Sequence, residues 1–115
     1  NYSLAIDLYK TAVEKAPGFA PLYCVLGDLY LATGYFEDAI TEYKMAIWLD
    51  NLNIPAYRHL CKAYEDLGDY DNAIEVYKKL QVKRTSDNGS MRVRLALMYW
   101  QNKFSVKKKL HNQIT

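Results

Sequence analysis

The sequence predicts an all-α fold, a solenoid of antiparallel helix-turn-helix repeats of 34 residues, and two observations carry this prediction. First, residues 20–53 align with residues 54–87 when the sequence is shifted by one repeat, and residues 5–10 align with residues 39–44. A fixed period of this length is typical of stacked helical units. Second, the recurring positions have helical spacing. They are Pro21/Pro55, Tyr23/Tyr57, Leu26/Leu60, Tyr30/Tyr64, Gly34/Gly68, Ala39/Ala73, Ile40/Ile74, Tyr43/Tyr77 and Lys44/Lys78.

The first helix of each full unit has a start signal, an apolar stripe and a stop signal. Pro21 and Pro55 suit the first turn of a helix, where a missing N–H costs nothing. Gly34 and Gly68 stand where a helix must stop in a left-handed residue. Between these signals, apolar residues follow the i, i+3, i+7 spacing of one helix face. They are Tyr23, Leu26 and Tyr30 in one unit and Tyr57, Leu60 and Tyr64 in the next.

The second helix of each unit shows a second apolar stripe. Asp69 follows Gly68 and suits the cap of this helix, because its side chain accepts a hydrogen bond from a free N–H. Small residues at Gly27 and Ala39 let two helix backbones approach closely, and the large tyrosines then fill the space between helices. This use of tyrosine explains a composition of eleven Tyr against three Phe. The second stripe consists of Ala39, Tyr43 and Ala46, and of Ala73, Tyr77 and Leu80.

These motifs resemble the tetratricopeptide repeat, whose consensus is W-x2-L-G-x2-Y…A-x3-F…P. The sequence has Tyr23-x2-Leu26-Gly27-x2-Tyr30…Ala39-x3-Tyr43 and Tyr57-x2-Leu60-Cys61-x2-Tyr64…Ala73-x3-Tyr77. Tyrosine replaces tryptophan and phenylalanine, and Cys61 replaces the glycine with another small residue. Pro17 matches the closing proline, whereas Asn51 and Thr85 do not, so we expect looser turns there. The resemblance covers residues 2–87 and implies a right-handed α-solenoid.

The C-terminal segment matches the repeat less well and aligns in two ways. If the preceding loop carries one extra residue, Leu95, Ala96 and Tyr99 occupy the Leu, Gly and Tyr positions, and we favour this register. Beyond Phe104 the match fails, although the apolar residues that follow keep helical spacing. We expect one domain over residues 1–115. It comprises a half repeat with the second helix only (1–19), full repeats (20–53 and 54–88), a degenerate repeat helix (89–104) and an atypical or capping helix (105–115).

Composition and charge exclude several function classes. The 115 residues carry a net charge of +2, too small to indicate nucleic acid or a membrane surface by itself. Apolar runs fall far short of the roughly 20 residues that span a bilayer, and the first ten residues lack the pattern of a signal peptide. Cys24 and Cys61 have no metal-like spacing, so we expect free thiols and a cytoplasmic location.

No catalytic, cofactor or metal site is predicted. The five glycines are isolated, so there is no phosphate-binding loop, and the hydrolase and zinc-protease motifs are absent. His59 and Cys61 are two residues apart on a helix and face different directions. Asp66, Asp69 and Asp71 resemble a calcium loop only superficially, and a helix end followed by a cap explains them better. We therefore expect a protein that is not an enzyme and uses no cofactor.

The predicted function is protein–protein interaction, as an adaptor or scaffold. The family resemblance implies that the first helices line a concave groove that holds a partner segment. Arg58 and Lys62 are i, i+4 and point the same way, so the pair would hold an acidic side chain or a peptide carboxylate. In the alternative interpretation, Lys62 pairs with Asp66 and both cations are solvated. The implied groove residues are Cys24, Asp28 and Leu31, then Arg58, Lys62 and Glu65, and an apolar end of Val93, Leu97 and Trp100.

One subset of the family grips the carboxylate end of chaperone tails with Lys, Asn and Arg spread over three consecutive units. If such a clamp began at the first full unit, Cys24 and Asp28 would stand where Lys and Asn are required. If it began one unit earlier, Val25 and His59 would replace the Asn and Arg. The sequence therefore disfavours binding of chaperone tails.

Two other functions are alternatives. Basic residues near Trp100 and Phe104 would neutralise phosphates of single-stranded RNA while the aromatic rings stack on bases. The first helix has no helix of its own unit to pack on, so we expect Ile6, Tyr9 and Val13 to be partly exposed. Such an apolar end favours self-association. The basic residues are Arg92, Arg94, Lys103, Lys107, Lys108 and Lys109.

Overall fold

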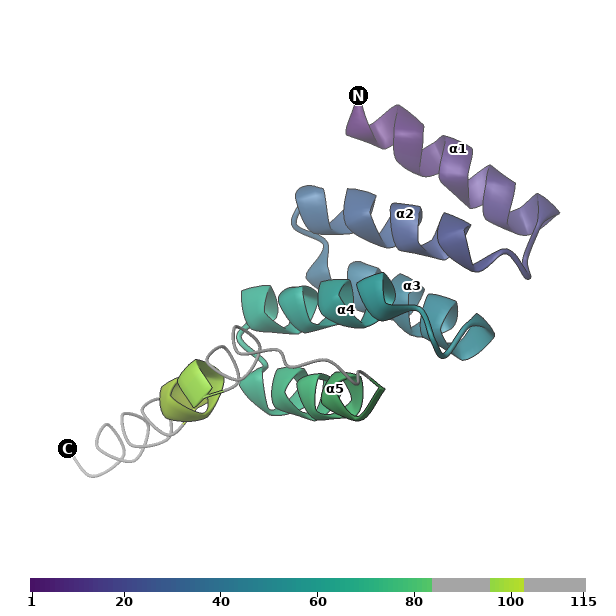
Figure 1. Ribbon diagram of the computed structural model, residues 1–115. Helices are drawn as coiled ribbons and strands as arrows, with labels where there is room; N and C mark the ends of the chain where they lie inside the picture. Colours follow the sequence, from purple (N-terminus) through teal and green to yellow (C-terminus); the bar gives the residue numbers. More distant parts are fainter. Residues whose placement is uncertain (84–95, 103–115) are drawn as a thin grey trace.

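The computed structural model describes residues 1–83 and 96–102, and the regular structure of this part is entirely helical. The numbered helices are α1 (Tyr2–Lys15), α2 (Ala20–Ala32), α3 (Phe36–Leu49), α4 (Ile54–Leu67) and α5 (Tyr70–Lys83). A further helix covers residues 96–102. Consecutive helices pack against each other in chain order, so the molecule extends from α1 to α5 as a stack (Figure 1). This architecture is a right-handed α-solenoid, and it confirms the predicted fold class.

The helix ends lie where the start and stop signals predict them. Pro21 and Pro55 stand in the first turns of α2 and α4. Gly34 and Gly68 each have φ +84°, the left-handed conformation that only glycine adopts without strain. The Oδ1 of Asp69 accepts a hydrogen bond from the Asn72 N–H at 3.3 Å, as expected of a cap for α5. The two repeats therefore use the same backbone turns.

The core follows the two predicted stripes. Tyr23, Leu26, Tyr57, Leu60 and Tyr64 of the first helices are buried, and so are all six residues predicted for the second helices. A Cβ added at Gly27 would lie 2.6 Å from Cε1 of Tyr43, which shows how closely α2 approaches α3. The expectation that the tyrosines fill the space between helices is wrong for Tyr2, which is 56% exposed, and for Tyr99, at 39%. Both lie at the ends of the described stack, where no further helix covers them.

Two contacts recur once per repeat between neighbouring units. The hydroxyl of Tyr23 donates to the Pro17 carbonyl at 2.7 Å, and that of Tyr57 donates to the Asn51 carbonyl at 3.2 Å. A lysine ammonium also lies over a tyrosine ring of the next unit. These distances to the ring centre are 5.9 Å for Lys10–Tyr30, 5.7 Å for Lys44–Tyr64 and 5.5 Å for Lys78–Tyr99. The last pair supports the register in which Tyr99 takes the position of Tyr64.

Part of the C-terminal prediction falls outside the described residues. The loop before the last repeat helix and the helix predicted for 105–115 both lie there. Within the described part, residues 96–102 are helical, and Met98 is only 2% exposed because it joins the main core cluster. None of the described helices has both the length and the apolar character that crossing a bilayer requires.

Candidate partner-binding face

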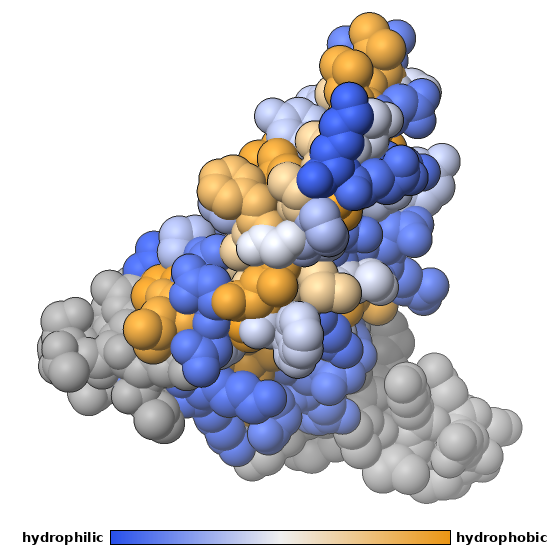
Figure 2. Space-filling view, turned by 90° about the vertical axis from the view of Figure 1, so that its right-hand side faces the viewer, coloured by the Kyte–Doolittle hydropathy of each residue, from blue (hydrophilic) through white to orange (hydrophobic). Residues whose placement is uncertain are grey.

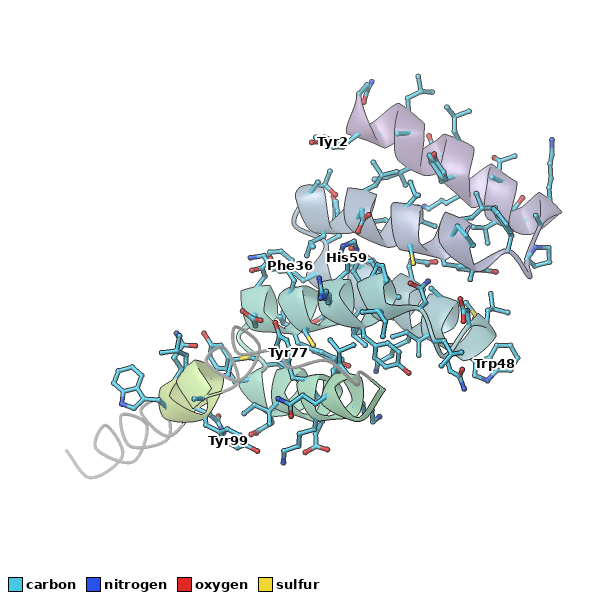
Figure 3. All side chains as sticks on the ribbon, in the orientation of Figure 1. Tyr2, Phe36, Trp48, His59, Tyr77 and Tyr99 are labelled. Carbon is cyan, nitrogen blue, oxygen red and sulfur yellow. The ribbon has the colours of Figure 1, made fainter. Side chains whose placement is uncertain are left out.

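We call the face formed by α2, α4 and the helix at 96–102 the inner face, and the one formed by α1, α3 and α5 the outer face. The structure places the predicted binding residues of α2 and α4 at or near the surface. Asp28, Arg58 and Lys62 are exposed, whereas Cys24, Leu31 and Glu65 are partly buried. Figure 3 shows α2 and α4 side by side, with His59 between them. The two helices therefore form one surface.

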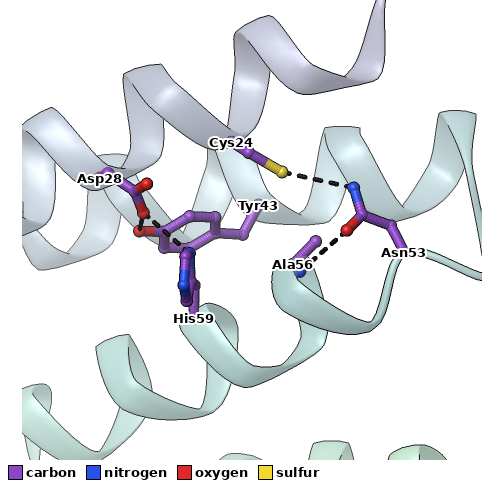
Figure 4. Close-up of polar contacts among 6 residues, drawn as sticks. All are labelled: Cys24, Asp28, Tyr43, Asn53, Ala56 and His59. Atoms are coloured by element: carbon purple, nitrogen blue, oxygen red, sulfur yellow. Dashed lines mark hydrogen bonds and ion pairs between the residues drawn. The ribbon is translucent and has the colours of Figure 1, made fainter.

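The carboxylate of Asp28 joins two repeats on the inner face (Figure 4). Tyr43 of α3 donates a short hydrogen bond to Oδ1, and Nδ1 of His59 on α4 lies 2.9 Å from the same oxygen. This nitrogen is buried and makes no hydrogen bond in the described part of the chain, so its contact with Asp28 is an ion pair only when the imidazole is protonated. Burial, followed by the hydrogen bond to Asp28, raises the pKa of the Tyr43 hydroxyl. Tyr43 therefore stays a neutral donor.

A second polar contact links the same repeats at Cys24. The amide of Asn53 lies 3.5 Å from the sulfur as donor, while its Oδ1 accepts from the Ala56 N–H at 3.2 Å and caps α4 (Figure 4). Burial raises the pKa of the Cys24 thiol, and the Asn53 hydrogen bond lowers it in part. Both cysteines are free thiols, as predicted. The sulfur of Cys24 therefore contacts the cap residue of α4 and does not simply face solvent.

Arg58 and Lys62, the two cations predicted to act together on α4, have different surroundings. The Nζ of Lys62 lies 2.8 Å from Oδ1 of Asp66, which is the i, i+4 ion pair of the alternative interpretation. Arg58 is exposed, and no ion pair reaches its guanidinium from residues 1–83 or 96–102. Glu65 accepts a hydrogen bond from the Tyr77 hydroxyl at 3.1 Å. Arg58 is therefore the cation most available to a ligand on this helix.

The predicted apolar end is partly described. Leu97 is 56% exposed and Trp100 is 63% exposed, which suits an anchoring surface. Val93 lies outside the described residues, and so do Phe104 and the basic residues of the RNA-binding alternative.

His59 and the two cysteines form no metal site in the described part of the chain. His59 is partly exposed on the inner face, whereas Cys61 is fully buried and faces Ala73, as their spacing predicts. Among the residues that the structure describes, no cluster of three or more His, Cys, Asp or Glu side chains could hold a metal ion.

Sequence reasoning missed the residues that hold the inner face together. Tyr43 was assigned to packing alone, and Asn53 was not singled out. A signal for Asn53 was present, because an asparagine directly before an apolar helix start is a typical cap. The contact of Asp28 with Tyr43 had no such signal, because it does not recur. The equivalent position in the next repeat is Lys62, whose ammonium cannot accept a hydrogen bond from a tyrosine.

A family model for the tetratricopeptide repeat matches residues 20–51 and 55–81, more than half of the chain. The chain therefore belongs to the tetratricopeptide repeat family. Its fold is that of a protein-interaction module, as the repeat predicted.

Known proteins resemble the chain over most of its length. It is 32% identical over 93 residues to human DnaJ homolog subfamily C member 7, which covers 76% of the chain and 19% of that protein. It is 36% identical over 80 residues to the heat-shock protein cognate co-chaperone sgt12 of Aspergillus fumigatus, covering 69% of the chain and 23% of that protein. The crystal structure of the Sgt2 TPR domain from Aspergillus fumigatus superposes with a TM-score of 0.77 at 27% identity, covering 92% of the chain and 71% of the domain. The chain thus spans about a fifth of the length of these curated relatives.

Proposed function

We propose that the chain binds a segment of a partner protein along its inner face, as an adaptor or scaffold module. The observation that carries this proposal is the exposed Arg58 at the centre of α4, with the exposed Leu97 and Trp100 on the next inner helix. A guanidinium binds a carboxylate in a bidentate manner, and exposed apolar side chains provide an anchor. The matching ligand is an acidic segment with a large apolar residue. Similarity to a co-chaperone supports protein binding in general, but the residues at the clamp positions argue against a chaperone tail as the ligand.

Lys62 contributes less than Arg58 in this proposal. Its ammonium is already paired with Asp66, and exposed pairs of this kind are worth little by themselves. An acidic ligand would have to compete with Asp66 for the ammonium. Replacing Asp66 with asparagine should therefore release Lys62 and strengthen binding by about two- to fivefold.

The test is a selection of random peptides on the immobilised chain, followed by calorimetric titration of the selected peptides. Acidic peptides with an aromatic or leucine residue should be enriched, and Arg58→Glu should weaken them at least tenfold. Lys79→Glu is the matched control, because it makes the same charge change at an exposed position of α5 on the outer face. The proposal fails if no acidic peptide is selected, or if both variants bind the peptide equally.

Self-association is a second candidate function, and one observation favours it. Helix α1 has no buried residue, and Tyr2, Leu4 and Leu8 are each more than half exposed. Ile6, Tyr9 and Val13 are partly exposed, as predicted. We infer that two copies would cover these side chains by pairing at α1. Analytical ultracentrifugation of the chain and of a Leu4→Lys, Leu8→Lys variant tests this, since a monomeric parent chain at high concentration excludes the pairing.

A further inference from the structure

A groove lies on the outer face between α1 and α3, with α2 as its floor. Its first part has a volume of about 290 Å³ and is bordered by Val13 and Glu14 of α1, Leu26 of α2, and Glu42 and Met45 of α3. A second hollow of about 450 Å³ continues from Met45 towards Trp48. The second hollow is lined by α3 alone and shares Thr41 and Met45 with the first, and we call the two together the outer groove. It lies on the face opposite to the one used in the proposed function.

Apolar side chains are accessible along this groove. Met45 is 40% exposed, Val13 is partly exposed, and Trp48 is 80% exposed. Figure 3 shows Trp48 at the right-hand edge of the molecule, pointing away from the helices. Figure 2 views that edge directly and shows apolar residues (orange) reaching the surface among polar ones (blue). Methionine and tryptophan adapt well to apolar ligands, because one is flexible and the other offers a large flat surface.

The charges that remain open in the groove are negative. Lys10 and Lys44 border it, but their ammonium groups lie over the rings of Tyr30 and Tyr64. Glu42 is partly buried, and no hydrogen bond or ion pair reaches its carboxylate from the described part of the chain. Burial raises its pKa, the carboxylate of Asp38 adds to this rise, and Lys10 opposes it. Glu42 is therefore a partly buried acid whose carboxylate forms no ion pair within the described part of the chain.

The fold itself does not require these acids. One repeat further on, the position of Glu42 is taken by Val76, which is only 8% exposed, and that of Glu14 is taken by Trp48. A valine therefore packs well at the equivalent position of α5, the second helix of the next repeat. Because a partly buried carboxylate without a partner costs stability, its presence in the first outer groove points to a ligand that supplies the missing cation.

We propose that the outer groove binds a segment of a partner protein in which a large apolar side chain neighbours a lysine or arginine. The apolar side chain would lie between Val13 and Met45, and the cation would reach Glu42, with Glu14 nearby. Trp48 would cover the emerging segment or stack on its cation. A charge-assisted hydrogen bond to Glu42 would be stronger than at an open surface, because the site is partly shielded from water. This ligand has the charge opposite to the one proposed for the inner face.

The experiment uses the complete 115-residue chain and an amidated peptide with a central Leu-Phe pair flanked by two lysines on each side. Binding is followed by amide shifts in NMR spectra of the isotope-labelled chain. The peptide should shift amides of α1 and α3, and Glu42→Gln should weaken it at least fivefold. Glu37→Gln is the matched control, since Glu37 is exposed in the first turn of the same helix, and it should change affinity less than twofold. Arg58→Glu should leave this peptide's affinity unchanged, which separates the outcome from that of the inner face.

Several results would overturn the proposal. An equal affinity for a peptide with glutamates in place of the lysines would show that Glu42 selects no cation. Amide shifts confined to α2 and α4, or an unchanged affinity in Glu42→Gln with retained helicity by circular dichroism, would place binding elsewhere. A dimer of the free chain that Glu42→Gln dissociates in sedimentation would make a second copy the occupant in place of a partner protein.

Discussion

At the scale of single residues, Gly27 lies against the ring of Tyr43, with no room for a side chain between them. Tyr43 is fully buried and its hydroxyl is bound to Asp28, so the ring cannot move aside to admit a methyl group. We predict that Gly27→Ala lowers the free energy of unfolding by about 1–3 kcal/mol. Chemical denaturation monitored by circular dichroism measures this. Gly18→Ala is the control, because no atom lies within 4 Å of the added Cβ, and an equal loss in both variants would contradict the prediction.

Glu42 gives a second prediction at this scale, with a defined pH dependence. Its pKa is raised in the folded chain, so the folded state binds a proton more readily than the unfolded state does. The carboxylate therefore weakens the fold above its folded pKa, and this penalty disappears as the pH falls through that value. We expect Glu42→Val to raise the melting temperature at neutral pH by about 2–4 °C. The gain should shrink on acidification in thermal scans, whereas a gain independent of pH would assign it to valine packing alone.

Residues that follow the repeat could be predicted, and residues that depart from it could not. Recurrence predicted the buried stripes, because a position that faces the core in one unit faces it in the next. The equivalents of Asp28, His59 and Glu42 in the neighbouring repeats are residues of other types. The repeat therefore does not predict which side chains these three residues contact. The Lys–Tyr pairs were predictable in principle, since both members recur, but two recurrences separated by about 20 residues show no contact until the helices are stacked.

At the scale of helices, the boundaries were well predicted because backbone chemistry fixes them locally. Proline in the first turn and glycine after the last turn act without help from the rest of the fold. The start of α3 differs from this pattern. It follows Tyr35, which offers no side-chain cap, whereas α5 follows Asp69. The two second helices therefore have different starts, although their apolar stripes are the same.

The left-handed turn at the end of α4 gives a prediction for one helix end. Gly68 has φ +84°, and nothing lies within 4 Å of an added Cβ, so a substitution meets backbone strain but no clash. Gly68→Ala should lower the free energy of unfolding by about 1 kcal/mol. Gly68→Asn should cost clearly less, because asparagine tolerates this conformation. Urea titrations of both variants distinguish strain from contact, since equal losses would mean that the backbone angle is not the cause.

At the scale of the whole molecule, each described helix depends on its neighbours in the chain. Helix α1 contacts α2 alone among the numbered helices and has no buried residue, whereas α4 contacts α2, α3 and α5. Stability in such arrays is a sum of units and their interfaces, and it varies along the stack. We predict that hydrogen exchange is fastest in α1 and slowest in α4. Mass spectrometry of peptides from a timed exchange measures this, and equal protection of α1 and α4 would contradict it.

The two tryptophans have a further consequence for experiments on the whole molecule. Trp48 lies beside the outer groove and Trp100 on the helix at 96–102, part of the proposed inner face, and both indoles are more than 60% exposed. The sequence contains no other tryptophan. Each proposed surface therefore carries its own fluorophore, with emission that shifts to shorter wavelength when a ligand removes water from the ring. A variant with either tryptophan replaced by phenylalanine keeps only the fluorescence of the other indole. A shift of the emission maximum in one such variant then reports which face a ligand occupies, without any added label.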